Sequence, residues 1–413
     1  MSEAAAPSAH VDTFSLDRLP ARADWPEFLF DLPELHYPEL LNASRELLEG
    51  GLEKGWGERA CLISAATGET WTYADLLAHS NRLANRLVAD YGLQPGNRVL
   101  LRGPNNPWLV ALWFAVVRAG GVVVPTMPLL RGKELATICE IAAIDLAVCD
   151  HRFTEDLVSA EIPGLRVLTY GAAEAGSDEA GALPDITLPD ITLPDITGGL
   201  EEVSADFTAV ATRADDVVTL AFTSGTTGRP KATMHFHRDI LANADTFSRH
   251  ILKPTADDVF IGTPPIAFTF GLGGLVIFPL RVGASTVLVE RATPAELAAT
   301  IDRHHATVCF TAPTAYKAML AGDVPVVSGL YFTRGYPSEP LVYRGRGNGY
   351  YGDWRIGDKV WADGVPTGCL LIHCSILRAM WKDSEEYQVS GQTLRRVFEE
   401  FRVRAERKSA VRL

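Results

Sequence analysis

The chain has 413 residues, of which 47% are hydrophobic and 22% are charged, and its formal net charge at pH 7 is −13. This length and composition allow a large buried core and predict a globular protein of two or three domains. The negative charge argues against nucleic acid or an anionic membrane as a partner, so any anion site must be made positive locally.

The first residues give no sign of export or membrane insertion. Residues 1–10 are small and polar, without the basic and apolar regions of a secretory signal. The longest apolar stretch, residues 108–130, is interrupted by Arg118, glycines and prolines, which indicates a helix followed by a buried strand. The six cysteines are scattered without metal-ligand spacing and favour a reducing compartment. We therefore expect a cytoplasmic protein without a membrane span.

From residue 70 the chain alternates between helical and strand-like patterns. Apolar residues at helical spacing predict a helix over residues 73–91. The segments that follow are a strand, a helix, a strand, a helix and a strand, at residues 98–101, 107–119, 122–125, 133–142 and 146–149. This rhythm predicts a doubly wound α/β fold, with largely parallel sheets, helices on both faces and a ligand beyond the carboxyl ends of the strands.

Residues 171–206 interrupt this rhythm. They contain Leu-Pro-Asp-Ile-Thr three times in tandem, beginning at positions 183, 188 and 193. The proline in each copy prevents a helix and removes a donor from any strand ladder, and three copies are too few to stack as a repeat protein. We expect an exposed loop that joins two α/β subdomains, residues 60–170 and 207–320.

The alternation resumes after the loop and continues to about residue 320. The expected strands are residues 217–222, 259–263, 285–288 and 307–311, and the expected helices are residues 239–250, 273–281, 294–304 and 313–320. Residues 330–352 hold five tyrosines among glycines and arginines without a sustained period. The basic tail returns to a helical pattern, for example over residues 392–407.

The strand at residues 217–222 leads into a loop of hydroxyls, glycines and one lysine, Thr223-Ser224-Gly225-Thr226-Thr227-Gly228-Arg229-Pro230-Lys231. The glycines let backbone N–H groups approach an anion, the hydroxyls are donors, and Lys231 supplies a positive charge. The composition also fits a polar surface turn, but hydroxyls and glycines in unbroken order before a lysine favour a phosphate site. Arg229 and Pro230 distinguish the loop from the common P-loop.

This loop resembles the phosphate-binding signature of the adenylate-forming superfamily, which includes acyl- and aryl-CoA synthetases, luciferases and the adenylation domains of peptide synthetases. Other segments resemble the aryl-CoA ligase branch, in particular the 2-aminobenzoate–CoA and benzoate–CoA ligases. They lie at residues 30–35, 71–73, 103–108 and 234–239. The resemblance covers residues 12–320, which it implies to be an AMP-binding type of N-terminal domain.

The resemblance implies a two-step reaction. An aromatic carboxylate attacks the α-phosphate of MgATP to give an acyl-adenylate and pyrophosphate, and the acyl group then passes to coenzyme A. It implies ATP, Mg²⁺ and coenzyme A as cofactors and substrates, and small molecules as the partners. The loop from Thr223 to Lys231 would hold the β- and γ-phosphates, and Lys231 would offset the accumulating negative charge.

The strand expected after the loop carries two candidate catalytic residues, His235 and His237. In the family a histidine near this point lies close to the acyl-adenylate, so either side chain could orient the carboxylate. Both could also be ordinary, partly buried histidines.

Two later segments are candidates for the acid pocket. Phe268, Phe270 and Gly271 begin a glycine-rich run, in which rings next to backbone without side chains would form a flat slot for an aryl acid. Ala312 lies in a segment that resembles the strand end lining the acyl pocket. Core packing is the alternative for the phenylalanines, and a structural role is the alternative for Ala312 and Pro313.

Residues 321–413 do not carry the features that the resemblance implies for them. No Thr-Glu loop for Mg²⁺, no hinge and no C-terminal domain with a catalytic lysine can be recognised in the sequence. The one counterpart of a ribose-binding aspartate is Asp358, which also fits a simple turn. We therefore expect an incomplete C-terminal part and an impaired ligase. The alternatives are a non-catalytic remnant that at most binds nucleotide, and a phosphotransferase or ATPase, which Arg229 and Pro230 disfavour.

Overall fold

The computed structural model describes residues 7–172, 193–223 and 230–319, and the backbone of four short strands beyond them. The chain divides by its contacts into two units. The first consists of Met1–Arg291 and His304–Phe310, and the second of Ala292–Arg303 and Thr311–Leu413. Both large sheets lie in the first unit.

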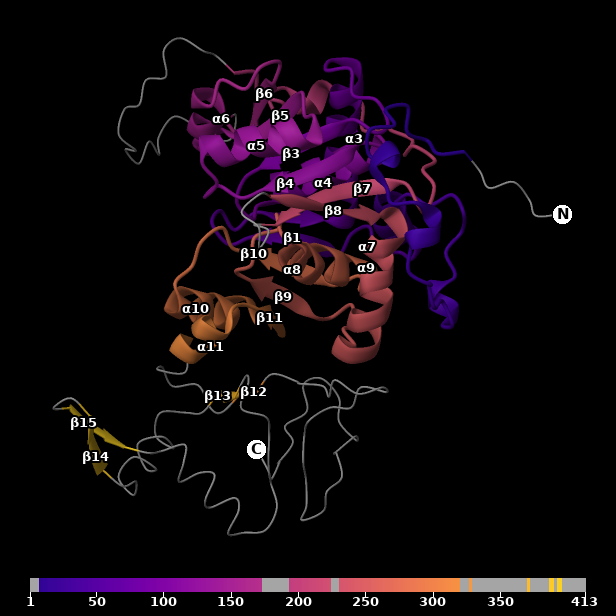
Figure 1. The fold of residues 1–413 in the computed structure, drawn as a ribbon. Coiled ribbons are helices and arrows are strands. Elements are labelled where there is room, and N and C mark those ends of the chain that lie inside the picture. The colour runs from indigo at the N-terminus through magenta and orange to yellow at the C-terminus, as the bar shows by residue number, and fades with distance from the viewer. Residues whose placement is uncertain are drawn as a thin grey trace. The chain divides into compact units, whose positions relative to one another are not determined.

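The first large sheet has six strands in the order β6-β5-β3-β4-β7-β8 (Figure 1). Its strands are β3 (Arg98–Arg102), β4 (Val122–Thr126), β5 (Leu146–Asp150), β6 (Arg166–Tyr170), β7 (Val217–Thr223) and β8 (Lys231–Phe236). All neighbours pair in parallel except β7 and β8, which form an antiparallel hairpin at the edge. The parallel strands bring their carboxyl ends to one edge, where α/β sheets bind ligands.

The second large sheet has five strands in the order β11-β9-β10-β1-β2. Its strands are β1 (Ala60–Ser64), β2 (Thr70–Thr72), β9 (Val259–Gly262), β10 (Ser285–Leu288) and β11 (Val308–Phe310). Strand β1 pairs in parallel with β10, with Leu62 opposite Thr286. Each sheet therefore combines strands from both expected subdomains. Strands β1 and β2 pair in one sheet with β9, β10 and β11, and strands β7 and β8 pair in the other with β3 to β6.

The helices begin at local capping signals. Thr72 and Asp75 form a reciprocal capping box for α3 (Tyr73–Ala89), and the Asn106 side chain accepts a backbone hydrogen bond at 2.9 Å at the start of α4 (Pro107–Arg118). The other α-helices are α1 (Ala43–Leu47), α2 (Glu49–Glu53), α5 (Gly132–Ala142), α6 (Glu155–Ser159), α7 (His237–Asn243), α8 (Thr269–Leu272), α9 (Phe278–Val282), α10 (Pro294–His304) and α11 (Pro313–Met319). The π-helical segments η6 (Ala244–Leu252) and η7 (Gly273–Ile277) continue α7 and α8. Across the described ranges, no helix combines the length and the apolar character that crossing a bilayer requires.

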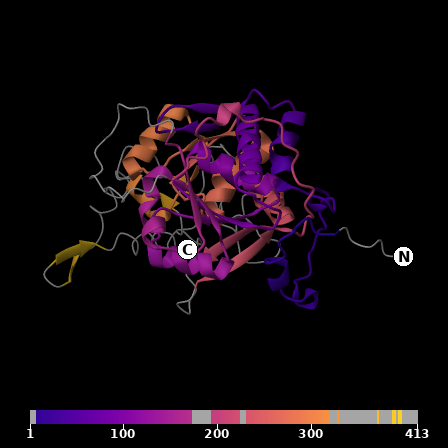
Figure 2. The ribbon, with the colours of Figure 1, turned by 90° about the horizontal axis from the view of Figure 1, so that it is seen from above.

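Helices cover both faces of the first sheet (Figure 2). On β3, Val99 and Leu101 pack in one hydrophobic cluster with α3 and α4, whereas Leu100 packs in another with α5. Strands that are buried on both faces are characteristic of parallel sheets. The predicted doubly wound α/β fold is confirmed, and the strands and helices expected at residues 73–149 and 217–320 are present with bounds that differ by a few residues.

The helix expected over residues 392–407 is wrong at its start. Gln392–Arg395 is strand β15, which pairs antiparallel with β14 (Glu386–Val389). The two residues between these strands are Ser390 and Gly391, which is the length and type of connection that favours a tight hairpin. Another antiparallel pair joins β12 (Val327–Ser328) and β13 (Leu370–Leu371).

The exposed loop expected over residues 171–206 is wrong for its last part. Residues 173–192, which hold the first two copies of the repeat, lie outside the described residues. In the third copy Ile196 is fully buried, and its backbone N–H donates to the Thr169 carbonyl oxygen at 2.8 Å. The Ile196 carbonyl oxygen accepts a hydrogen bond from Arg86 of α3 at 2.9 Å. The third copy is therefore packed between β6 and α3.

Candidate functional site

The predicted phosphate loop joins the two antiparallel strands at the edge of the first sheet. Strand β7 ends at Thr223 and β8 begins at Lys231, and these exposed residues are partners in the strand register. The residues between them that carry the glycines and hydroxyls lie outside the described residues: Ser224, Gly225, Thr226, Thr227 and Gly228. The pairing of Thr223 with Lys231 closes the base of this loop at the carboxyl end of β7.

Alternation along β8 places Lys231, Thr233 and His235 on one face of the hairpin. The intervening side chains, including Met234, pack in the hydrophobic cluster on the other face. Thr233 Oγ1 donates a hydrogen bond to the Ala221 carbonyl oxygen at 3.2 Å, and His235 Nε2 lies 3.1 Å from the same Oγ1. Because the hydroxyl proton is used by the carbonyl, His235 Nε2 is the donor to Oγ1. Thr233 thus holds the imidazole on the face that carries the lysine.

His237 lies in the interior instead. It is fully buried, and its Nδ1 accepts a hydrogen bond from the Ala43 backbone N–H at 3.1 Å. Burial lowers the pKa of His237 to about 3, against a smaller opposite effect of Asp216. The neutral, enclosed ring has no access to a substrate. The strand alternation ends with β8 at Phe236 and α7 begins at His237, so the two histidines do not share a face.

The candidate aryl pocket has exposed aromatic rings, but backbone atoms fill the space next to its glycine. Phe268 and Phe270, at the start of α8, are 40% and 52% exposed, and the Phe270 ring meets Phe310 edge-on with centroids 5.7 Å apart. A Cβ atom at Gly271 would collide with the Pro265 carbonyl oxygen. Gly271 therefore permits a close approach of the backbone and does not open a slot on that side.

Asn105, which the sequence reasoning did not assign, fixes the turn before α8. Its Nδ2 donates to the Pro264 carbonyl oxygen at 2.9 Å, and its Oδ1 accepts from the Ile266 N–H at 2.9 Å. Asn105 follows β3 of the first sheet, whereas the turn follows β9 of the second. The buried amide therefore links the carboxyl edges of the two sheets. Its signal in the sequence is an asparagine three residues after the end of a buried strand.

A second link between these edges is an ion-pair network that was also not predicted. Arg152 donates to both carboxylate oxygens of Asp150, at 2.9 and 2.8 Å, and to both oxygens of Glu290, at 2.9 and 2.8 Å. Asn106 Nδ2 donates to the same two carboxylates at 3.2 and 3.4 Å. These hydrogen bonds raise the pKa of Arg152, so the guanidinium stays charged. Asp150 ends β5 and Glu290 follows β10, so the network connects the two sheets.

The other predicted site residues belong to the second unit. Ala312 is exposed, and its carbonyl oxygen accepts backbone hydrogen bonds at 2.9 and 3.2 Å from residues of α11. Asp358 lies outside the described residues. In the part of the chain that the structure describes, no three His, Cys, Asp or Glu side chains are grouped so that they could hold a metal ion.

Comparison with known proteins places most of the chain in one family model. The model described as AMP-binding enzyme matches residues 53–339. The chain is 31% identical over 297 residues to a benzoate–CoA ligase of Thauera aromatica, in an alignment that covers 71% of this chain and 53% of that enzyme. The chain spans about half the length of the curated relatives that it matches.

Two solved structures share the fold. One is the anthranilate CoA ligase AuaEII in complex with anthranoyl-AMP, with a TM-score of 0.62 at 24% identity over 71% of this chain and 54% of that chain. The other is ATP-bound MatB from Rhodopseudomonas palustris, with a TM-score of 0.58 at 29% identity over 69% of this chain and 52% of that chain. The fold of this chain thus occurs in proteins whose structures hold an acyl-adenylate or ATP.

Proposed function

Because the chain belongs to the AMP-binding enzyme family, we propose that it is an ATP-dependent acid–CoA ligase for an aromatic carboxylate of the benzoate or 2-aminobenzoate type. In the proposed reaction the carboxylate attacks the α-phosphorus of ATP, which forms an acyl-adenylate and releases pyrophosphate. The coenzyme A thiol then attacks the acyl carbon, which forms the thioester and releases AMP. The observation that carries the proposal is the hairpin that pairs Thr223 with Lys231 inside the matched region.

We assign the β- and γ-phosphates to residues 223–228 and Lys231. Hydroxyl and backbone N–H groups of the loop would donate hydrogen bonds to phosphate oxygens. Lys231 would offset the charge that accumulates as pyrophosphate leaves. Mg²⁺, when bound with ATP, would neutralise further phosphate charge. Since the described residues offer no cluster that could hold the ion, no protein ligand is assigned to it.

We assign the acid to candidate residues of β8 and α8. His235 is the proposed contact of the carboxylate, because it shares the face of Lys231 and its ring is held by Thr233. Phe270 is the proposed contact of the aromatic ring, since exposed rings favour edge-on or offset stacking. By resemblance, Gly271 stays a proposed acid contact. Ala312 likewise stays a proposed acid contact by resemblance, and Asp358 stays the proposed ribose anchor.

A pyrophosphate-release assay tests the proposal. The purified chain is incubated with ATP, Mg²⁺ and either benzoate, 2-aminobenzoate, 4-hydroxybenzoate or acetate, and acyl-AMP and acyl-CoA are identified by mass spectrometry. Pyrophosphate release with an aromatic acid, lost in Lys231→Ala and kept in Lys133→Ala on the exposed side of α5, is the supporting result. ADP as the product would instead indicate a phosphotransferase or ATPase.

A chain that binds nucleotide without ligase turnover is the second candidate. It is favoured by residues 321–413, whose sequence offers no recognisable metal loop, hinge or catalytic lysine. ATP binding in calorimetry without any product would support this candidate.

Because residues 321–413 lack these features, we propose an AMP-binding type of domain over residues 12–320 and a divergent segment after it. In either case the proposed partners are small molecules, and the cytoplasm, which supplies ATP and coenzyme A, is the proposed location.

A further inference from the structure

Two consecutive prolines leave the turn before α8 short of hydrogen-bond donors of its own. Pro264 and Pro265 have no backbone N–H. The Asn105 side chain supplies partners from outside the turn, because its Nδ2 donates to the Pro264 carbonyl oxygen and its Oδ1 accepts from the Ile266 N–H, both at 2.9 Å. Building on the proposed function, in which Phe270 contacts the acid, we propose that Asn105 is a positioning residue that holds this ring for an aromatic carboxylate.

The groups that the Asn105 amide meets fix its orientation. A backbone carbonyl oxygen only accepts and a backbone N–H only donates, so Nδ2 faces Pro264 and Oδ1 faces Ile266. Asn105 is 4% exposed, so a lost bond would leave a buried polar group without a partner. An aspartate of the same shape would still accept from Ile266, but its carboxylate has no proton to donate to the Pro264 carbonyl oxygen. The amide is therefore required for both bonds.

The turn that Asn105 holds determines where α8 begins. The Phe268 N–H donates to the Pro265 carbonyl oxygen at 3.0 Å, and a Cβ atom at residue 271 would collide with the same oxygen. Gly271 therefore lets the first residues of α8 lie directly against the turn. Phe270 immediately precedes Gly271, so a displacement of the turn would displace the backbone that carries the Phe270 ring.

Phe310, at the end of β11, supports the Phe270 ring from a second direction. The two rings meet edge-on with their centroids 5.7 Å apart. The Phe310 ring is itself packed on the chain, because a Cβ atom at Gly274 would collide with it. Phe270 is nevertheless 52% exposed, so part of its ring is open to a ligand. An aromatic acid can therefore stack on a ring whose place is set by the turn and by Phe310.

Asn105 comes from the sheet that carries the proposed phosphate loop. It follows β3, and the parallel neighbours β3, β4 and β7 bring their carboxyl ends to one edge. The amide thus fixes the turn before Phe270 relative to the edge from which the loop leaves β7. Attack of a carboxylate on ATP requires both reactants at contact distance, and a displacement of about 1 Å can cost about 10²-fold in rate. Asn105 is suited to keep the acid in register with the nucleotide.

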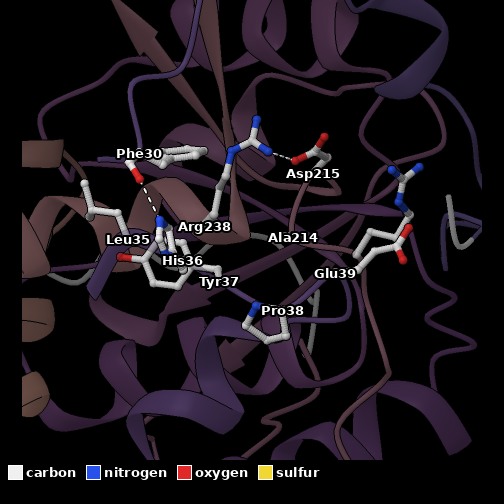
Figure 3. A pocket seen from close by; sticks show the side chains of 10 residues that line it. Phe30, Leu35, His36, Tyr37, Pro38, Glu39, Ala214, Asp215 and Arg238 are labelled. Atoms are coloured by element: carbon white, nitrogen blue, oxygen red, sulfur yellow. Dashed lines mark hydrogen bonds and ion pairs between the residues drawn. The ribbon is translucent and has the colours of Figure 1, made fainter. Parts of the chain in front are cut away.

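The pocket shown in Figure 3 is the alternative place for an aromatic acid. It has a volume of about 360 Å³ and is lined by Phe30 and Arg238 among others. The Arg238 guanidinium offers no donor to a carboxylate, because its Nη1 is paired with Asp215 and its Nε and Nη2 are buried. Arg238 also follows β8, at the end of the hairpin opposite the phosphate loop. The acid is therefore expected at Phe270 and not in this pocket.

Calorimetric titration with benzoate in the presence of α,β-methylene-ATP tests the positioning role. This analogue cannot release pyrophosphate, so binding is measured without turnover. Asn105→Asp is expected to weaken benzoate binding by about tenfold or more, because the displaced ring contacts the acid less well, and to change the affinity for the nucleotide by less than about twofold. Asn105→Gln, which carries both amide groups on a longer side chain, is expected to show the same selective loss and replaces Asn105→Asp if that variant does not fold.

Asn42→Asp is the matched control. Asn42 is also buried, and its Nδ2 donates to the Val117 carbonyl oxygen at 3.0 Å while its Oδ1 accepts from the Ser44 N–H at 3.1 Å. This variant is expected to lower the melting temperature and to leave both affinities unchanged. Equal benzoate affinity in the parent and a folded Asn105 variant would overturn the positioning role alone, as would a parallel loss of benzoate and nucleotide affinity. A parent that binds the nucleotide but no aromatic acid would overturn the proposed function as well.

Crystals of the parent chain soaked with 4-bromobenzoate and the same nucleotide give a test that requires no variant. The expected result is an anomalous bromine peak beside the Phe270 ring, with Asn105 bonded to the turn as described. A bromine peak only in the pocket of Figure 3 would show that the acid does not use Phe270 and would overturn the role of Asn105.

Discussion

At the scale of single residues, the interior holds two histidines as neutral rings. His10 is 6% exposed and His237 is fully buried. Burial lowers the pKa of both, to about 3 for His237, while the carboxylate of Asp216 acts in the opposite direction on each. Protonation of either ring would place a charge in a site from which water is excluded.

These histidines predict that stability falls on acidification. The unfolded chain binds a proton at each ring below pH 6.5, whereas folded His237 does so only near pH 3, so its contribution is complete above pH 6.5 and is lost as pH falls. The free energy of unfolding should decrease by about 1.4 kcal/mol per pH unit for His237 alone between pH 5.5 and 4, where the unfolded ring is protonated and the folded ring is not. Urea unfolding at these pH values measures the slope. His237→Gln should reduce it by about one proton, and an unchanged slope would contradict the assignment.

Lys231 is predicted to contribute charge to nucleotide binding and nothing to the fold. Its side chain is exposed at the start of β8, so Lys231→Ala should leave the melting temperature unchanged. Loss of a charge-assisted hydrogen bond should weaken ATP binding by about 1.5–3 kcal/mol. Calorimetry with ATP on the parent, Lys231→Ala and the exposed control Lys133→Ala measures this difference. Equal affinities in all three would remove the phosphate role.

At the scale of elements, the third repeat copy acts as a short packed connection between β6 and α3. The carbonyl oxygens of Ile196, Gly198 and Gly199 accept hydrogen bonds from Arg86. Asn81 of the same helix donates to the Ala205 carbonyl oxygen at 2.7 Å. The proline excludes this segment from a helix, and its pairing with β6 is a single bridge between Thr169 and Asp195. Other carbonyl groups of the segment therefore remain available to these side chains.

Ile196 is predicted to be the anchor of this connection. Ile196→Ala should lower the free energy of unfolding by about 2–5 kcal/mol, and Ile196→Val by about 0.5–1.5 kcal/mol, because the side chain is fully buried. Urea unfolding of the three proteins measures both values. Deleting one whole copy should change stability little, since an identical copy then precedes Gly198. A large loss on that deletion would show that the number of copies matters as well.

At the scale of the whole molecule, polar links hold the carboxyl edges of the two sheets against each other. Asn105 reaches from the end of β3 to the turn after β9, and Arg152 bridges Asp150 and Glu290. These links use side chains that follow strands, the positions at which an α/β protein places its ligand contacts. In this chain these links hold together two places. One is the edge at which β7 enters the proposed phosphate loop, and the other is the edge at which β9 enters the turn before Phe270.

The 413-residue chain is predicted to form aryl-CoA slowly or not at all. The proposed reaction needs a metal loop, a ribose anchor and a second domain that moves over the site, and Asp358 is the one recognisable counterpart of these in residues 321–413. Each lost charge-stabilising group costs a factor of about 10²–10³ in rate. Mass spectrometry of aryl-CoA, with the Thauera aromatica benzoate–CoA ligase as positive control, measures the turnover. Robust thioester formation would show that the tail supplies these groups in another form.

The sequence by itself determined the local elements and the chemistry of the loop. The alternation of strands and helices could be predicted because it depends on neighbouring residues. These are the apolar residues that recur with a period of 2 or 3.6, and the helix caps at Thr72 and Asn106. The ends of the phosphate loop were found for the same reason, because Thr223 and Lys231 are only eight positions apart in the sequence. The hairpin of β14 and β15 was missed because residues 392–407 were predicted to be a basic helix.

Only the tertiary structure decided which residues share a surface. Strand β1 pairs with β10 across more than half of the chain, and no local pattern encodes a partner at that distance. The burial of Ile196, the separation of His235 from His237, and the meeting of Phe30 with Arg238 in one pocket depend on how the completed core excludes water. Such contacts form between segments far apart in the sequence, and their energy comes from the packing of the whole domain.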